Sequence, residues 1–305
     1  MLAYPTKRFF SYLSTNKTMN KAAKKWGLKL GASQVVAGKT IEEAIEVIRR
    51  LTDEGLVCTI DHLGEFVEEE TEAIKATEAA LQILDKIAET GVACNLSIKL
   101  TKLGLDISEQ LCLDNMRKIV ALANKHSNFV RIDMEDYQHL EQTLSILRQL
   151  DKEFHNVSTV IQAYLYRSEG DVLSLNGHPL RLVKGAYRER EEVAFQSKRE
   201  IDKNYMKLIK LHLRNGNYTA IATHDHLIIE KVKKFVKAQR IPTSRFEFQF
   251  LYGFRPKLQR ELVAQGYKVR VYVPFGEEWF GYFMRRLAER PQNVSFALKG
   301  LFSRK

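Results

Sequence analysis

Short apolar runs alternate with longer amphipathic segments along most of the chain. The runs are rich in β-branched and aromatic residues, which is typical of buried strands. They cover residues 55–61, 92–99, 129–133, 157–162, 180–184, 218–223, 246–251 and 268–274. Each run is followed by a segment long enough for a helix, as at residues 68–90, 201–215 and 225–240. The pattern therefore predicts eight strands alternating with eight helices.

This order of elements favours an α/β fold in which the strands close into a parallel barrel of the TIM type. An open doubly wound sheet is the alternative, but no glycine-rich GxGxxG turn follows the first run. Residues 1–50 precede the repeats and predict a basic helical arm, and residues 51–305 are assigned to the barrel. No linker rich in proline, glycine or serine interrupts the series, so one catalytic domain is expected.

Composition and charge narrow the function classes. The 305 residues are 45% hydrophobic, enough for one large core. The net charge of +11 implies an acidic partner, which leaves nucleic acid, an anionic membrane and a phosphate-bearing cofactor open. There is no run of about 18 uncharged apolar residues and no secretory signal, so we expect a cytoplasmic protein. Three cysteines without ligand spacing and the absence of an HExxH motif predict no metal site.

Polar residues mark the end of each predicted strand, where a barrel carries its chemistry. They are Asp61, Lys99, Asp133, Gln162, Lys184, Thr223, His224, Tyr252 and Tyr272, with Arg181 inside the fifth run. Any one of them singly fits an ordinary loop start. Together they form a ring of both charge signs that could hold a zwitterion and a flavin or phosphate.

A second signal is the pair Arg285 and Arg286, which follows Tyr282 on a predicted helix. Positions 282 and 285 share a helix face, and position 286 lies about 100° round the axis from 285. Two guanidinium groups and a phenol can thus converge on one small anion. The alternative is a solvated basic helix end before Pro291.

The chain resembles the flavin-dependent proline dehydrogenases, particularly the short monofunctional bacterial form. The resemblance rests on SIKLTKLG (97–104), RIDMED (131–136), RLVKGAY (181–187), ATHDH (222–226), FEFQFLYG (246–253), VRVYVPFGEEW (269–279) and YFMRRLAERPQN (282–293). It implies a distorted (βα)8 TIM barrel with extra N-terminal helices, whose last helix lies over the active site. It also implies noncovalent FAD, oxidation of L-proline to Δ1-pyrroline-5-carboxylate, and electron transfer to a membrane quinone.

The resemblance also implies roles for individual residues. Asp133 and Arg181 are expected to be catalytic, Asp133 by pairing with the cations and Arg181 by stabilising reduced flavin near N5. The substrate-binding residues implied are Lys99, Tyr272, Tyr282, Arg285, Arg286, Leu251 and Ala186. The cofactor-binding residues implied are Met134, Gln162, Arg181, Lys184, Gly185, Ala186, Thr223, His224 and Glu289. His224 as an ordinary capping residue is the alternative, and a simple core role is the alternative for Tyr272, Tyr282, Leu251 and Ala186.

The expected reaction is hydride transfer from proline C5 to flavin N5 with the amine neutral, and no residue is assigned as its base. Electrons would pass to a membrane quinone, with peripheral contact to anionic lipid at the inner face of the cell membrane. A chain of 305 residues leaves no room for an aldehyde dehydrogenase module, so a separate pyrroline-5-carboxylate dehydrogenase would act next.

Two other function classes fit parts of the sequence. One is a barrel aldolase or isomerase that forms a Schiff base on Lys99 or Lys184. The other is a nucleic-acid or membrane-surface protein, suggested by the charge. Against nucleic acid, the basic residues are dispersed through helices without an aromatic stacking platform.

Overall fold

The computed structural model describes residues 32–64 and 66–289, and beyond Met284 it describes a side chain only for Arg286. The strands are β1 (Val57–His62), β2 (Cys94–Ile98), β3 (Val130–Ile132), β4 (Val157–Gln162), β5 (Leu180–Val183), β6 (Thr219–Ala222), β7 (Phe246–Leu251) and β8 (Val269–Phe275). Each of the eight predicted runs overlaps a strand, so the predicted barrel is confirmed.

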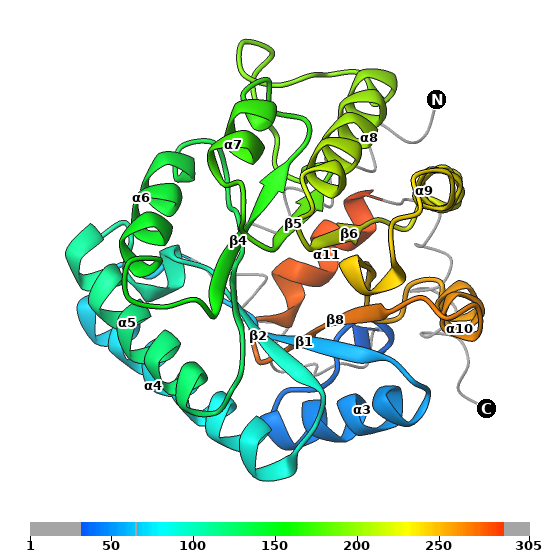
Figure 1. The fold of residues 1–305 in the computed structure, drawn as a ribbon. Coiled ribbons are helices and arrows are strands. Elements are labelled where there is room, and N and C mark those ends of the chain that lie inside the picture. Colours follow the sequence, from blue (N-terminus) through cyan, green and yellow to red (C-terminus); the bar gives the residue numbers. More distant parts are fainter. Residues whose placement is uncertain (1–31, 65, 290–305) are drawn as a thin grey trace.

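Helices α3 to α10 lie round the outside of the barrel, and α11 lies across one end of it (Figure 1). They are α3 (Ile41–Asp53), α4 (Glu70–Thr90), α5 (Glu109–Lys125), α6 (Leu140–Leu150), α7 (Ser168–Ser174), α8 (Lys198–Arg214), α9 (His226–Ala238), α10 (Pro256–Ala264) and α11 (Trp279–Glu289). Short 3-10 turns are η2 (Ala32–Gln34), η3 (Thr101–Leu103) and η4 (Thr243–Arg245). Of the predicted N-terminal arm, residues 1–31 lie outside the described residues, and α3 continues past residue 50.

The strands pair in chain order and all in parallel, and β1 pairs with β8 to close the barrel. This last pairing runs from Val57 beside Arg270 to His62 beside Phe275. All strand ends of one kind therefore lie on one side, and the carboxyl ends bring together residues that are far apart in sequence.

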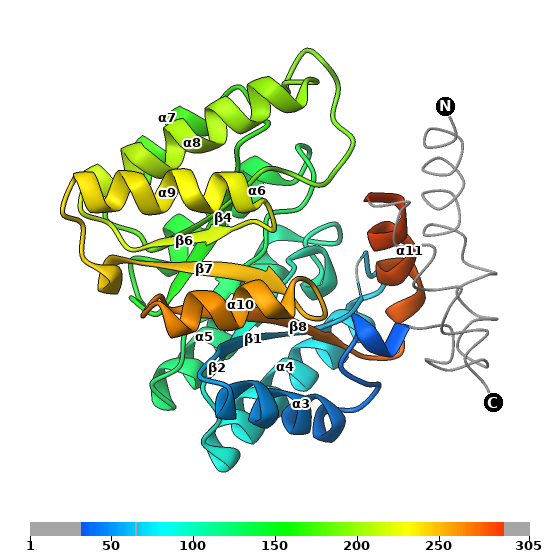
Figure 2. The same cartoon turned by 90° about the vertical axis from the view of Figure 1, so that its right-hand side faces the viewer.

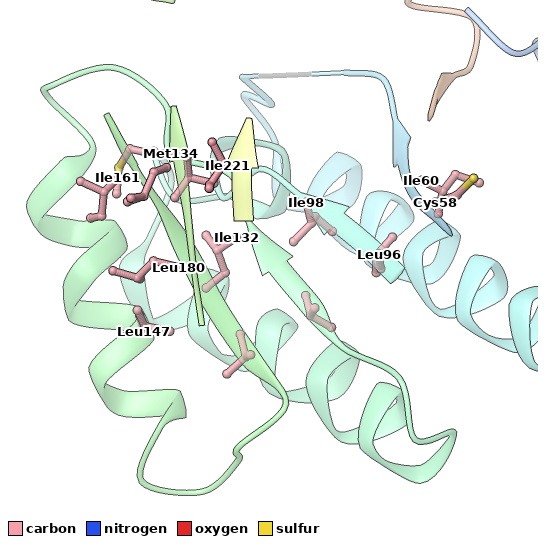
Figure 3. Close-up of a cluster of buried hydrophobic side chains, with 14 of the residues drawn as sticks. Cys58, Ile60, Leu96, Ile98, Ile132, Met134, Leu147, Ile161, Leu180 and Ile221 are labelled. Carbon is pink, nitrogen blue, oxygen red and sulfur yellow. The ribbon is translucent and has the colours of Figure 1, made fainter. Parts of the chain in front are cut away.

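The barrel wall has an apolar outer face. Because neighbouring residues in register point to the same side of a sheet, the pairing separates two sets of side chains. The outward set packs against the helices, and Figure 3 shows part of it. It includes Cys58, Ile60, Leu96, Ile98, Ile132, Ile161, Leu180 and Ile221. The principal apolar core therefore lies between the strands and the helices.

The inward set is unusually polar. It includes Thr59, Asp61, Asn95, Ser97, Arg131, Ser158, Gln162, Arg181, Glu247, Gln249, Arg270 and Tyr272. Most of these side chains are buried, so their charges and hydrogen bonds must be satisfied within the barrel. The interior of this barrel is therefore lined largely by polar and charged side chains.

A second, smaller apolar cluster lies beyond the carboxyl ends of the strands. In it, Trp279, Phe280 and Phe283 of α11 pack with Ala32 of η2 and with Leu63. Figure 2 shows α11 and η2 on the same side of the barrel. This packing holds the last helix at the carboxyl end of the barrel.

Candidate active site

Asp133 is the centre of a hydrogen-bond network at the carboxyl end of the barrel. The residue follows β3, and its side chain is 13% exposed. Its Oδ1 accepts hydrogen bonds from Ser97 Oγ at 2.8 Å and from Arg181 Nη1 at 2.7 Å. Its Oδ2 accepts one from Tyr272 Oη at 2.6 Å. Three strands besides β3 thus direct polar groups at one carboxylate.

Lys99 links this network to a second carboxylate. Its Nζ donates to Asp61 Oδ2 at 2.9 Å and lies 3.7 Å from Asp133 Oδ2. Burial alone would raise the pKa of Asp61, but the ammonium groups of Lys99 and Lys102 outweigh it and the pKa is lowered. Asp61 is therefore ionised at neutral pH, and Lys99 is held between two carboxylates.

Arg181 is held on more than one side. Its guanidinium lies 5.4 Å from the centre of the Tyr272 ring, and its Nη1 also donates to Ser97 Oγ at 3.2 Å. The side chain is 6% exposed. Its Nε has no hydrogen-bond partner among the described residues, although the atom is buried. A buried guanidinium N–H without a partner is a donor that a bound group could use.

Gln162 presents a matching acceptor. Its Nε2 donates to the backbone oxygen of Glu135 at 2.6 Å, while its buried Oε1 has no partner within the described chain. Glu135 is fixed in turn, because its carboxylate accepts the Thr101 N–H at 3.0 Å and the Thr101 hydroxyl at 2.6 Å. Met134 precedes Glu135, and its side chain is buried. Because Gln162 and Thr101 both hold Glu135, the backbone at Met134 is held in place as well.

The segment after β5 contains three residues assigned to the cofactor. Lys184 Nζ lies 2.5 Å from Asp202 Oδ1 and 3.1 Å from Asp225 Oδ2, so protein carboxylates already pair with it. Gly185 has a φ of +114°, and a Cβ there would lie 2.3 Å from the ring of Tyr164. The close approach that requires glycine is to Tyr164. Ala186 follows and is exposed.

The loop after β6 is also fixed by internal hydrogen bonds. The hydroxyl of Thr223 accepts the Asp225 N–H at 3.1 Å, and Asp225 caps α9. His224 Nε2 accepts the Leu251 N–H at 3.0 Å, and its ring stacks on Phe254 at 4.9 Å. Because Asp225 is the cap, the capping alternative for His224 is wrong, and His224 instead ties this loop to the end of β7.

The last helix supplies a second part of the site. Tyr282 is 6% exposed, and the guanidinium of Arg286 lies 5.2 Å from the centre of its ring. The two side chains therefore share a helix face, as four-residue spacing predicts. Arg285 and Glu289 belong to α11, but their side chains lie outside the described residues.

Three residues of the network have no site role predicted from the sequence. Asp61 is predicted only as a polar residue at a strand end, and Ser97 and Glu135 have no individual prediction. Ser97 stands two positions before Lys99, so a strand turns both side chains to the same face, and this spacing could have identified it. Glu135 carried no such signal, because its role depends on a loop contact.

The residues fit a flavin. An isoalloxazine ring carries both hydrogen-bond acceptors and a donor, and the site offers the buried N–H of Arg181 and the buried oxygen of Gln162. The same site has cations for a small carboxylate. Within residues 32–64 and 66–289, no group of three histidine, cysteine, aspartate or glutamate side chains could hold a metal ion.

Comparison with known proteins gives a consistent result. The profile of the proline dehydrogenase family matches residues 44–299. Proline dehydrogenase 1 of Bacillus subtilis subsp. natto is 52% identical over 297 residues, covering 97% of this chain and 98% of its own. Proline dehydrogenase of Deinococcus radiodurans is 42% identical over 285 residues and covers 91% of each chain. Proline utilization A from Bdellovibrio bacteriovorus, solved after inactivation by N-propargylglycine, superposes with a TM-score of 0.80 at 28% identity, over 90% of this chain and 34% of that longer one.

Proposed function

The chain belongs to the proline dehydrogenase family, which carries out the first step of proline catabolism, and we propose that it oxidises L-proline to Δ1-pyrroline-5-carboxylate with FAD as its cofactor. The observation that carries the proposal is the network around Asp133, at the carboxyl end of a barrel with this family's sequence. The Schiff-base alternative has less support, because Lys99 and Lys184 are each paired with two carboxylates and a protonated amine is not a nucleophile.

The substrate carboxylate needs cations that can face it. We assign this role to Lys99 and to Arg285 and Arg286 of α11. The position of α11 beyond the strand ends supports the assignment, and so does the support that the Tyr282 ring gives to Arg286. Charge-assisted hydrogen bonds of this kind contribute about 1.5–3 kcal/mol each. Tyr272, Tyr282, Leu251 and Ala186 are assigned to the walls around the proline ring.

Asp133 is assigned a positioning role rather than that of a base. Its carboxylate already accepts hydrogen bonds from Ser97, Arg181 and Tyr272. Both of its oxygens are thus engaged in holding donors of the protein. Its contribution is to fix Arg181, Lys99 and Tyr272 relative to one another, so that the site is organised before substrate enters.

When bound, the flavin supplies a ring nitrogen, N5, that takes up the hydride from C5 of proline. We assign Arg181 and Gln162 to its ring, since each has a buried polar atom without a partner in the described chain. The backbone at Met134 is assigned to the same ring. Lys184, Gly185, Ala186, Thr223, His224 and Glu289 are assigned to the remainder of the cofactor. Arg181 there would stabilise the negative charge that reduction creates.

The steps outside the barrel form part of the same proposal. A membrane quinone is assigned as the electron acceptor, and the net charge of +11 supports peripheral attraction to anionic lipid. Among the described residues, no helix has both the length and the apolar content needed to cross a membrane. The cytoplasm, at the inner face of the cell membrane, is the proposed location. A separate pyrroline-5-carboxylate dehydrogenase is assigned to the next step.

A visible spectrum of the purified protein tests the function directly. Bound flavin absorbs near ~450 nm, and anaerobic addition of L-proline should bleach that band as the flavin is reduced. D-proline at the same concentration is the control and should leave the band unchanged. A colourless protein, or a yellow one that L-proline does not bleach, would refute the proposal.

A further inference from the structure

The barrel has a polar cavity at the end where its strands begin. Its volume is about 290 Å³. Its lining is Thr59, Asn95, Phe129, Arg131, Pro179, Arg181, Tyr218, Glu247, Gln249, Lys268 and Arg270. Phe129, Pro179, Tyr218 and Lys268 each stand immediately before a strand, so the cavity lies at the end of the barrel opposite to Asp133.

Positive charge in this cavity exceeds negative charge. Four of the lining side chains are cationic and only Glu247 is acidic. Arg181 is paired with Asp133, which leaves Arg131, Lys268 and Arg270 around one carboxylate. Glu247 is already satisfied, because it accepts hydrogen bonds from Arg270 Nε at 2.7 Å, from Tyr218 Oη at 2.8 Å and from Gln249 Nε2. Lys268 Nζ lies 3.6 Å from the same carboxylate. Arg131, by contrast, donates only to backbone oxygens and makes no ion pair with a carboxylate of the described residues.

Polar atoms that line the cavity lack partners. Thr59 Oγ1 is buried and makes no hydrogen bond within the described chain. Arg131 donates from Nη1 to the backbone oxygens of Thr159 and Pro179, and no hydrogen bond to a described residue uses its Nε or Nη2. Burial, followed by the charge of Arg181, lowers the pKa of Arg131 to about 9. The cavity is therefore lined by hydrogen-bond donors that no described residue uses, next to cationic side chains.

We propose that this cavity binds a small oxyanion, either inorganic phosphate or a short dicarboxylate, held by Arg131, Lys268 and Arg270. An oxyanion accepts hydrogen bonds at several oxygens at once, which matches guanidinium groups with free N–H donors. It also supplies the missing negative charge in a buried setting, where an unpaired cation is costly. The assignment does not depend on the proposed catalytic function, because Arg131, Lys268 and Arg270 have no part in the proposed substrate or cofactor sites.

Isothermal titration of the full-length protein tests the site. Sodium phosphate and sodium succinate are the probes, compared with sodium chloride at equal ionic strength. Saturable binding of one of them, absent with chloride, is expected, and the probe that binds identifies the oxyanion class. Equal weak effects of all three salts would overturn the proposal.

Variants then locate the binding. Lys268 is at the rim and its side chain is 46% exposed, so Lys268→Gln should fold normally and weaken binding about fivefold or more. Lys207→Gln is the matched control, because Lys207 is 56% exposed and paired with Glu169 on the surface, and it should bind like the parent. Lys99→Met removes a cation from the proposed active site and should also bind like the parent. Loss of binding in Lys99→Met with none in Lys268→Gln would place the anion at the active site and refute the cavity.

Discussion

Arg181 of β5 donates a hydrogen bond of 2.7 Å to Asp133 at the end of β3, across the inside of the barrel. The intervening strand β4 lies between them in the sheet, so the bond crosses the interior and does not follow the wall. It joins the residue proposed to face the flavin to the residue that organises the cations. Binding of substrate and binding of cofactor are therefore expected to depend on one another.

Replacing Asp133 should affect both stability and activity. Asp133→Asn keeps the shape but leaves Arg181 and Lys99 facing a neutral amide. Breaking a buried ion pair on one side costs about 3–5 kcal/mol, and we expect the free energy of unfolding to fall by about 3 kcal/mol. The proline kcat/KM should fall by about 100-fold, as when a preorganised polar group is lost. Chemical denaturation and steady-state kinetics measure the two effects.

The control for that variant is Asp114→Asn. Asp114 pairs with Arg117 on the surface, and its side chain is 49% exposed. It should leave both the unfolding free energy and the kinetics close to those of the parent. Similar losses in both variants would mean that the network around Asp133 contributes no more than a surface ion pair.

Arg286→Met should raise the proline KM by about 10- to 100-fold, the equivalent of one charge-assisted hydrogen bond. Flavin content, read from the absorbance ratio of the purified protein, should stay near that of the parent. Arg285→Met is expected to behave in the same way. The control is Arg260→Met, which removes a surface arginine that pairs with Glu54. Parallel loss of flavin in the α11 variants would indicate a structural role for the pair.

His139 should make stability depend on pH. Its ring lies 2.6 Å from Asp136 Oδ1 and 2.8 Å from Asp106 Oδ1, and it joins the loops that follow β2 and β3. Burial lowers its pKa, but the two carboxylates outweigh burial and the net pKa is raised. A raised pKa gives stability that is complete below about pH 6.5 and is lost as the pH rises through the folded-state pKa.

Thermal unfolding of the parent and of His139→Gln at about pH 5.5, 7 and 9 measures this effect. At the lowest pH the parent should unfold at a higher temperature than His139→Gln, and the difference between the two unfolding temperatures should narrow as the pH rises. A difference that widens with pH would show that the neutral ring, rather than the ion pair, stabilises these loops.

Two glycines separate backbone strain from steric clash. Gly185 and Gly177 have φ angles of +114° and +99°, but only at Gly185 would a Cβ meet another atom, the Tyr164 ring at 2.3 Å. Gly177→Ala should cost about 1–2 kcal/mol of unfolding free energy from strain alone. Gly185→Ala should cost about 1–3 kcal/mol more, because the ring must move. Urea denaturation compares them, and equal costs would show that Tyr164 yields freely.

The barrel could be predicted from the sequence because each strand is a short apolar run with polar residues at its carboxyl end. Which side chains meet inside the barrel could be predicted only in part. Lys99 and Asp133 were predicted to lie together, and their separation of 3.7 Å confirms it. This succeeded because both follow parallel strands, whose carboxyl ends meet on one side of the barrel.

Other contacts depend on side chains that approach from separate elements, which no local pattern records. Lys184 was assigned to the cofactor, yet it reaches Asp202 on α8 and the cap residue Asp225 of α9. The polar lining at the opposite mouth was also missed. Arg131, Glu247 and Arg270 read as ordinary alternating residues in the sequence, and only closure of the barrel brings them together.

The pairing of β1 with β8 also has a consequence for how the chain acquires its structure. Cys58 and Val271 are neighbours in the sheet, so the ring cannot close until the last strand has left the ribosome. Until then β1 presents an unpaired edge with apolar residues, the kind of surface that recruits chaperones or other nascent chains. Contacts of such long sequence separation slow folding. Truncation before β8 would therefore be expected to yield an aggregating polypeptide rather than a smaller folded one.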